Sequence, residues 1–412
     1  MGGGGLKGLG EAPFSEGTQD AKLSRLVKWL SSTTMVKIEI VGIFLAVILF
    51  LLISNLSDPN VRSATVYGSL FGLMALGLTL TYITTKVPNF AYGSFVTIGM
   101  YTSYTLYRLN YKVLGSTMTP YLSAPIAFLI GALVSVTMYL VVLRSLARRG
   151  SSLVALMIAT LAIDIGFVGI FGIFSDYLFN VYRLNDSKSF PQLFNADFSI
   201  LGVPGIVFAA PLLLAVLSIA LLALLTWTKL GVAMRAAVEN PKLAQVLGIN
   251  VELMYVIAWF LAGGFAASSG SYYILSQRGS VDEGSNLIVG IFAASVLGGL
   301  ASIYGAILGG VIIGASEILI TTYLAQTKIQ VTSQFLTIPV SFSIGGSEVI
   351  GYQKGVPLLI MIATLLLFPR GLVSIDPRNI IRLLWNLPTR MQSRGRRIWR
   401  LLSRIIVRFF HR

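Results

Sequence analysis

The sequence lacks cysteine altogether and has a single histidine, His411, beside its C-terminal end. Without thiols the chain forms no disulfide, no cysteine metal site and no thiol nucleophile, and one terminal histidine excludes a histidine cluster. Charged residues make up only 11% of the chain, whereas 55% is hydrophobic and the mean hydropathy is +0.80. This composition excludes the soluble domains that the length of 412 residues would otherwise suggest, and it indicates a membrane protein.

Apolar runs close to the ~20 residues that cross a ~30 Å hydrocarbon core recur along the chain. We expect crossings at residues 38–53, 64–83, 90–107, 121–143, 152–174, 205–227, 253–276, 287–301, 303–324 and 356–369. Several runs are short, and the run from 287 to 324 is broken at Gly298, Gly299 and Gly305, which favours re-entrant or discontinuous helices. The sequence therefore predicts an all-α polytopic membrane protein with about 8–10 transmembrane helices.

The 31 Lys and Arg residues set the expected orientation. With ten crossings both termini share one side, and most basic residues fall on that side, which the positive-inside rule identifies as the cytoplasm. We divide the chain into a flexible cytosolic tail (1–37), a transmembrane domain (38–372) with an extra N-terminal helix at 38–53, and a basic C-terminal tail (373–412). We expect a multi-pass protein of the cell membrane with cytoplasmic N- and C-termini.

The C-terminal tail has the pattern of a helix that lies on a lipid surface. Arginines recur every fourth residue beside an apolar face; they are Arg396, Arg400, Arg404, Arg408 and Arg412. This arrangement predicts contacts with membrane lipid phosphates. Nucleic-acid binding is the other interpretation of an arginine-rich run, and the broad apolar face disfavours it.

One long polar segment, residues 229–250, separates two apolar runs on the cytoplasmic side. Its sequence KLGVAMRAAVENPKLAQVLGIN predicts a short helix, a break at Asn240, and a second helix that starts at Pro241 and ends at Gly248. Such a segment offers a surface helix to another protein. The alternative is a connector that lies on the membrane face.

Two carboxylates, Asp164 and Glu317, fall inside the apolar runs. Each costs several kcal/mol unless it faces protein or water, so neither is expected to face lipid. Their isolation favours a structural hydrogen-bonding role over a proton relay. Small-residue pairs predict close helix packing; they are Gly68/Gly72, Gly305/Gly309 and Gly310/Gly314.

Four motifs, in order along the chain, carry a family resemblance. They are MALGLTLTY with VPNFAYGSFVTIGMYTSY, then RAAVENPKLAQVLGIN, SVLGGLASIYGAILGGVIIG and LFPRGL. Together they resemble the permease subunits of branched-chain amino acid ABC importers. This chain departs from the family at Tyr92, where the family usually has histidine, and at Ile83-Thr84-Thr85, where glycine is common.

The resemblance implies a translocation subunit that is no enzyme. The sequence has no GxxxxGK[ST] pattern to hold ATP, so the implied partners are two ATPase subunits, with a second homologous permease and an extracytoplasmic solute-binding protein. The ATPases are expected to dock on the segment 229–250, through Arg235, Glu239, Asn240, Pro241, Gly248 and Ile249. No catalytic residue, cofactor or metal site is expected.

Glycine clusters coincide with short apolar runs in two places, where half-helix ends can offer polar backbone groups to a zwitterion. The expected pathway residues are Asn89, Phe90, Tyr92, Gly93, Ser94, Gly298 and Gly299. A permease for urea, short amides or another small solute is an alternative function. An autonomous secondary transporter is a further alternative, but no clear inverted repeat or run of intramembrane charge supports it, and the lack of His, Cys and carboxylate clusters disfavours a membrane enzyme.

Overall fold

The computed structural model describes residues 58–109, 112–113, 116–117, 119–200, 202–326, 329–335, 338–344, 353–367 and 371. The tails 1–37 and 373–412 and the expected helix 38–53 lie outside these residues. Two compact units divide at Arg62, and the features below belong to the second, from Ser63 onward.

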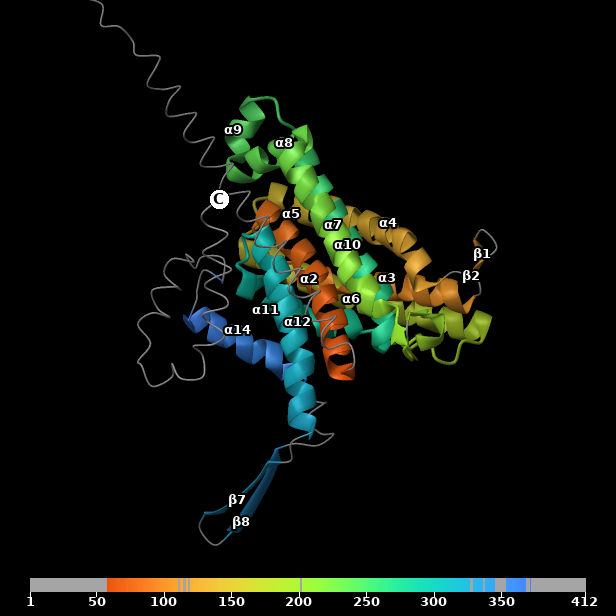
Figure 1. Ribbon diagram of the computed structural model, residues 1–412. Coiled ribbons are helices and arrows are strands. Elements are labelled where there is room, and N and C mark those ends of the chain that lie inside the picture. Colours follow the sequence, from red (N-terminus) through yellow and green to blue (C-terminus); the bar gives the residue numbers. More distant parts are fainter. Residues whose placement is uncertain are drawn as a thin grey trace, which may run out of the picture. The chain divides into compact units, whose positions relative to one another are not determined.

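The described part of the chain is largely helical (Figure 1). Its α-helices are α2 (Pro59–Thr85), α3 (Tyr92–Arg108), α4 (Pro120–Met138), α5 (Arg144–Arg148), α6 (Leu153–Tyr182), α7 (Ile206–Trp227), α8 (Lys229–Glu239), α9 (Pro241–Val246), α10 (Val251–Ser276), α11 (Glu283–Gly298), α12 (Ile303–Gln326) and α14 (Gly355–Leu367). A π-helical turn, η1 (Tyr139–Leu143), joins α4 to α5, and η2 (Phe194–Ala196) is a 3-10 turn.

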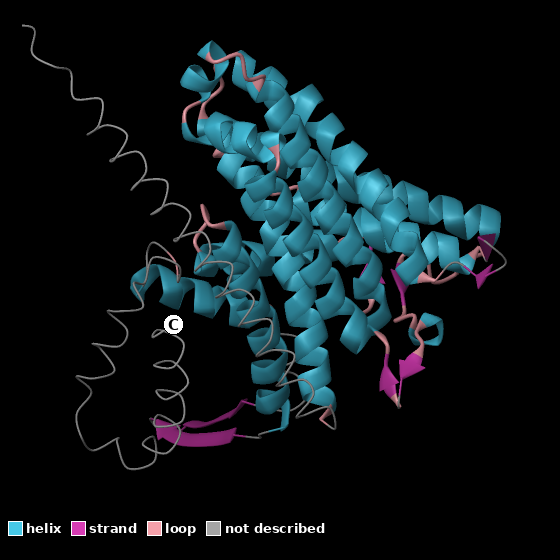
Figure 2. Ribbon diagram, turned by 45° about the horizontal axis from the view of Figure 1, so that its top comes forward, coloured by secondary structure: helices cyan, strands magenta, loops and turns pink. Residues whose placement is uncertain are grey.

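Antiparallel strand pairs lie in the connections between the helices (Figure 2). The pairs are β1 (Lys112–Val113) with β2 (Ser116–Thr117), β3 (Ser189–Phe190) with β6 (Gly279–Ser280), β4 (Ser199–Ile200) with β5 (Val203–Pro204), and β7 (Ile329–Phe335) with β8 (Ile338–Ile344). The β3–β6 pair links the connection after α6 to the connection after α10, with Phe190 opposite Gly279. The β7–β8 hairpin follows α12, with Ile329 opposite Ile344.

Six helical spans among the described residues are long and apolar enough to cross a membrane. They are α2, the continuous α4–η1–α5 unit, α6, α7, α10 and α12, while α11 and α14 are shorter apolar helices. Each expected crossing that falls in the described residues coincides with a helix, which confirms the all-α polytopic prediction.

Two predicted helix ends were wrong. Gly305 lies inside α12 rather than in a break, because Ser302 Oγ accepts a hydrogen bond from Gly305 N at 3.1 Å and starts the helix there. The break falls at Gly299, whose φ of +96° suits a residue without a side chain. In addition, α6 continues past the predicted end at residue 174, and it ends where Arg183 adopts a left-handed φ of +56°.

Two small-residue pairs meet across the seam between α2 and α12. A Cβ atom added to Gly310 would collide with the backbone of Gly72, and one added to Gly314 would lie 2.7 Å from the Cα atom of Gly68. The helices approach closely because neither carries a side chain at these positions, as the sequence predicts.

Helix α10 packs along both α3 and α4. Trp259 is fully buried, its ring stacks on Tyr139 at 5.4 Å, and its carbonyl accepts a hydrogen bond from Ser135 Oγ at 2.9 Å. Closer to the C-terminal end of α10, the hydroxyl of Ser271 lies 2.5 Å from that of Ser103 on α3. In a membrane, where apolar burial drives helix association weakly, such hydrogen bonds and close contacts hold helices together.

Helix α6 is the least buried of the six spans: only 17% of its most apolar stretch is buried inside the protein. Its buried residues fall on one face, from Leu156 through Thr160 and Asp164 to Phe171. Its outer side chains are large and apolar, for example Ile165 and Ile173, which are 68% and 73% exposed. This apolar outer face suits a helix surrounded by lipid.

Candidate functional site

The segment 229–250 folds as the sequence predicts, into two short helices with a break between them. Asn240 ends α8 and caps α9, because its Oδ1 accepts a hydrogen bond from Leu243 N at 3.1 Å. Pro241 begins α9, and Gly248 adopts a φ of +80° after it. Asn250 Oδ1 then caps α10 through Leu253 N at 3.1 Å. Every helix end in the segment therefore has a side chain or residue type suited to it.

This segment, which we call the coupling segment, buries one side and exposes the other. Met234 and Ala237 face the protein from α8, whereas the apolar side chains of α9 point outward: Leu243 is 55% exposed, Val246 83% and Leu247 70%. Of the residues expected to contact a partner, Arg235, Glu239, Asn240, Pro241 and Gly248 are exposed and Ile249 is half-buried. An exposed apolar surface rimmed by polar residues is typical of a protein–protein contact.

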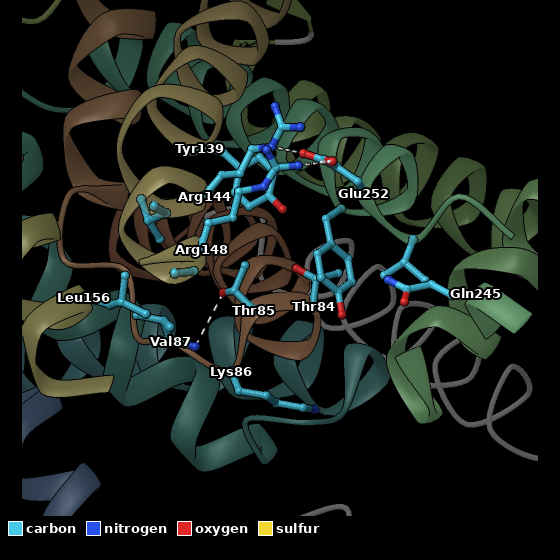
Figure 3. Close-up of a pocket in the computed structure, with 14 residues that line it drawn as sticks. Thr84, Thr85, Lys86, Val87, Tyr139, Arg144, Arg148, Leu156, Gln245 and Glu252 are labelled. Carbon is cyan, nitrogen blue, oxygen red and sulfur yellow. Dashed lines mark hydrogen bonds and ion pairs between the residues drawn. The ribbon is translucent and has the colours of Figure 1, made fainter. Parts of the chain in front are cut away.

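A pocket of about 510 Å³ lies at the base of the coupling segment (Figure 3). It is lined by Thr84, Thr85, Lys86, Val87, Tyr139, Leu143, Arg144, Ala147, Arg148, Leu156, Gln245, Val251, Glu252 and Tyr255. Glu252, in the first turn of α10, pairs with both Arg144 and Arg148; Arg148 Nη2 lies 3.0 Å from its Oε2 atom. The pocket thus joins the end of the coupling segment to α5.

This ion-pair cluster is not evident from the sequence, in which the basic residues indicate only the cytoplasmic side of the membrane. A carboxylate in the first turn of a helix is a favourable pattern that could have singled out Glu252. Its partners Arg144 and Arg148 lie 108 and 104 residues earlier in the chain, and no local pattern reveals such a pairing.

The expected pathway residues at the start of α3 are packed inside the helices. Asn89 and Tyr92 are fully buried, and Ser94 is 1% exposed. The Tyr92 hydroxyl donates to the carbonyl of Ala262 on α10 at 3.2 Å, and Ser94 Oγ donates to Asp164 Oδ1 on α6 at 2.6 Å. Asp164 is therefore buried and hydrogen-bonded, as predicted, rather than exposed to lipid.

Two more contacts fix the start of α3. Phe90 N donates to Thr160 Oγ1 at 3.2 Å, and a Cβ atom added to Gly93 would collide with the carbonyl of Gly284 at the start of α11. The Asn89 side-chain nitrogen is buried without a hydrogen-bond partner among the described residues. The motif thus brings α6, α10 and α11 together around one helix end.

Helix α3 begins inside the helix layer rather than at its edge. Ala262, which contacts Tyr92, lies about 16 Å along α10 at 1.5 Å per residue. A helix that starts at this depth places its first N–H groups away from both surfaces, as in the discontinuous helices of transporters. The backbone N–H groups of Ala91, Tyr92 and Ser94 are satisfied locally, by Asn89 and by the carbonyl of Ala91. Gly298 and Gly299 do not join this cluster: they end α11 and pack against Gly305 and Gly371.

Among the residues that the structure describes, no group of three or more His, Asp or Glu side chains could hold a metal ion. The buried polar groups instead pair with hydroxyls and backbone atoms.

Comparison with known proteins identifies the family. The family described as branched-chain amino acid transport system, permease component, matches residues 60–365. The probable branched-chain amino acid transport permease protein LivH of Methanocaldococcus jannaschii is 41% identical over 335 residues, which cover 81% of this chain and 98% of that protein. No solved structure matches the chain.

Bacterial relatives match more distantly over the same region. The high-affinity branched-chain amino acid transport system permease protein LivH of Escherichia coli is 29% identical over 291 residues, or 66% of this chain and 88% of that protein. The corresponding protein BraD of Pseudomonas aeruginosa is 28% identical over 264 residues, or 61% of this chain and 81% of that protein. This chain, a multi-pass membrane protein by its helices, therefore belongs to the family of permease components of branched-chain amino acid transport systems.

Proposed function

We propose that the chain forms the translocation pathway of an ATP-driven importer for branched-chain amino acids in the cell membrane. An extracytoplasmic binding protein delivers the amino acid, a second homologous permease completes the pathway, and two ATPase subunits supply the energy. Both termini lie in the cytoplasm. The relatives, which are named as branched-chain amino acid permeases, favour this substrate over urea, short amides or another small solute, and the form of the coupling segment supports the docking of ATPases.

The outward apolar surface of α9 is the observation that carries the proposal. Leu243 and Val246 on α9 and Leu247 directly after it expose 55%, 83% and 70% of their surface; Asn240 caps the start of α9, and Asn250 caps the α10 helix that follows. Exposed polar side chains, Lys242 and Gln245, border this apolar surface on the same helix, as at many protein–protein contacts. A groove on an ATPase suits a short amphipathic helix of this kind.

Movement of the ATPases would reach the membrane through α10, which begins directly after the coupling segment. Tyr139 and Ser135 hold α10 to α4, and the pair formed by Glu252 with Arg144 holds its first turn to α5. A shift of the coupling segment therefore moves α10 and α4 together. The start of α3 contacts α10 through Tyr92, so a shift of α10 would displace the start of α3 as well.

The docking assignment is tested by the affinity of purified ATPase subunits for the membrane-inserted permease. Val246→Ser removes an exposed apolar side chain, and we expect about tenfold weaker ATPase binding, because burying such a side chain contributes about 1.5–3 kcal/mol. Glu239→Lys reverses an exposed charge at the end of α8, the helix that precedes α9, and is also expected to weaken ATPase binding.

Leu230→Ser is the matched control, since Leu230 is also an exposed apolar residue, 46% exposed, but lies at the start of α8. All three variants should insert into the membrane like the parent chain. Unchanged ATPase affinity for both Val246→Ser and Glu239→Lys would contradict the assignment of the coupling segment.

A further inference from the structure

A buried carboxylate lies in the seam between α2 and α12. Glu317 is 2% exposed, in the middle of a membrane span, and the Tyr67 hydroxyl donates to its Oε1 atom at 3.1 Å. Gln353 also hydrogen-bonds to Glu317, and Lys354 acts on it through its charge. Within the described part of the chain, however, no cation lies within ion-pair distance of Glu317. The hydrogen-bond donors Tyr67 and Gln353 are neutral, so among the described residues the charge of Glu317 is opposed only at a distance, by Lys354, at a depth where a lone carboxylate is costly.

A second tyrosine–carboxylate pair lies beside the first. The Tyr273 hydroxyl donates to Glu283 Oε1 at 3.0 Å, and the Tyr67 and Tyr273 rings are 6.0 Å apart. Tyr67 also stacks on Phe71 at 4.6 Å. Both tyrosines are 3% exposed. Carboxylates beside aromatic ring faces are the groups that bind an organic ammonium ion.

Thr321 supplies an independent observation. It lies one helical turn beyond Glu317 on the same buried face of α12, it is 5% exposed, and its hydroxyl has no hydrogen-bond partner among the described residues. A buried hydroxyl without a partner costs stability, and in native proteins it calls for an explanation. A ligand that forms a hydrogen bond with the Thr321 hydroxyl would explain why this group has no partner in the protein.

The cluster lies at the end of α10 opposite the coupling segment. Tyr273 is in the last turn of α10, and Glu283 begins α11. Asp282, which is exposed, precedes Glu283 and receives a hydrogen bond from Ser280 Oγ at 2.8 Å. Three carboxylates therefore lie at increasing depth: Asp282 is exposed, Glu283 is half-buried and Glu317 is buried. Their negative charge attracts a cation from the surface toward Glu317.

We propose that Glu317, with Tyr67, Tyr273 and Thr321, binds the ammonium group of the transported amino acid on the side of the membrane opposite the coupling segment. This inference rests on the proposed function and assigns one subsite to it. The Glu317 carboxylate supplies the charge, the Thr321 hydroxyl accepts one N–H, and the tyrosine rings supply the aromatic faces. The close packing of the cluster describes the closed site, which opens when α2 and α12 separate during transport.

The first test measures ATP-dependent uptake of L-leucine by proteoliposomes that hold the complete importer with its binding protein. Glu317→Gln keeps the shape of the side chain and removes its charge, and we expect kcat/KM to fall at least about tenfold. Glu317→Asp keeps the charge and should recover part of the activity. Asp176→Asn is the control, since Asp176 is an exposed carboxylate, 54% exposed, that pairs with Lys188.

Thr321→Val separates ligand binding from a structural role. Valine matches threonine in shape and removes an unpartnered hydroxyl, so thermal stability should stay the same or rise. The proposal nevertheless predicts a raised KM for leucine. An unchanged KM in both Thr321→Val and Glu317→Gln would overturn the ammonium site while leaving the importer assignment intact.

A second readout removes the binding protein, whose own selectivity could hide the effect. Thermal stabilisation of the permease complex is measured with L-leucine, with 3-methylbutylamine, which keeps the ammonium, and with 4-methylpentanoate, which lacks it. The two ammonium compounds should stabilise the parent chain and not Glu317→Gln. Stabilisation by 4-methylpentanoate alone would refute the site, whereas failure of the complete parent importer to take up leucine would refute the proposed function instead.

Discussion

Substitution of Gly310 by alanine tests the seam between α2 and α12 directly. The added Cβ atom would lie 2.6 Å from both the Gly72 nitrogen and the Phe71 carbonyl oxygen, whereas ordinary contacts begin at 3.4 Å. These partners are backbone atoms of a long helix, so no side-chain rotation relieves the collision. The two helices must move apart, which also stretches the 3.1 Å hydrogen bond from Tyr67 to Glu317.

The size of the effect follows from two opposing contributions. Overpacking a well-packed interior costs about 1–3 kcal/mol. Alanine in place of glycine inside a helix contributes about 0.5–1 kcal/mol in the other direction. Gly310→Ala should therefore lower the free energy of unfolding by roughly 0.5–2 kcal/mol. Gly169→Ala on α6 is the control, because its added Cβ has no atom within 4 Å and only the helix-favouring contribution remains.

The assay is equilibrium unfolding of the purified chain in mixed micelles, with helical content followed against denaturant. The difference between the two variants isolates the steric contribution, about 1–3 kcal/mol, because the change in helix propensity is common to both. If Gly310→Ala proves as stable as Gly169→Ala, α2 and α12 do not approach as closely as the glycine contacts indicate. The hydrogen bond from Tyr67 to Glu317, which crosses the same seam, would then be refuted as well.

Three further predictions concern the ends of helices. Glu252→Gln leaves Arg144 and Arg148 without their carboxylate; because these groups are partly exposed, unfolding should change by less than about 1 kcal/mol, while ATP hydrolysis should become less tightly coupled to uptake, measured as ATP consumed per leucine. Asn240→Ala removes the cap of α9 and should cost about 0.5–2 kcal/mol locally, seen as faster amide exchange over residues 241–247 with no change in α6. The Ser280 hydrogen bond lowers the pKa of Asp282, so the stability that this carboxylate contributes is full above its unfolded pKa of about 3.9 and is lost as pH falls through the lower folded value. Ser280→Ala should bring the folded pKa closer to the unfolded one, so the acid-dependent loss of stability becomes smaller and is complete at higher pH, seen in amide exchange at the start of α11.

Local patterns in the sequence predict the elements well, because the membrane imposes long apolar runs and helix ends need particular residues. The break at Asn240, the start at Pro241 and the turn at Gly248 all rest on such local chemistry. Gly305 shows the limit of the same reasoning. Glycine marks a break in an apolar run and also a close helix contact, and only the position of Ser302 decides between them.

The contacts that build the candidate sites join residues far apart in the chain. Tyr67 and Glu317 are 250 residues apart, and Ser94 and Asp164 are 70 apart. The cost of a buried charge predicts that Asp164 and Glu317 avoid lipid, which their burial confirms, but it does not name their partners. A single sequence therefore predicts that a polar partner exists and leaves its identity to the packing.

Helix α10 connects the two regions that the proposals assign to energy supply and to substrate. Its first turn carries Glu252 at the coupling segment, and its last turn carries Tyr273 beside the proposed ammonium site. Between them Trp259 stacks on Tyr139, and Ser271 lies 2.5 Å from Ser103, so α10 is fixed to its neighbours along its length. A helix held at both ends and in the middle resists local bending, so in the proposed mechanism a push on its first turn moves α10 together with α3 and α4. Among the described contacts of the seam between α2 and α12 are the glycine contacts and the hydrogen bond from Tyr67 to Glu317, and the proposed ammonium site requires these two helices to separate when it opens.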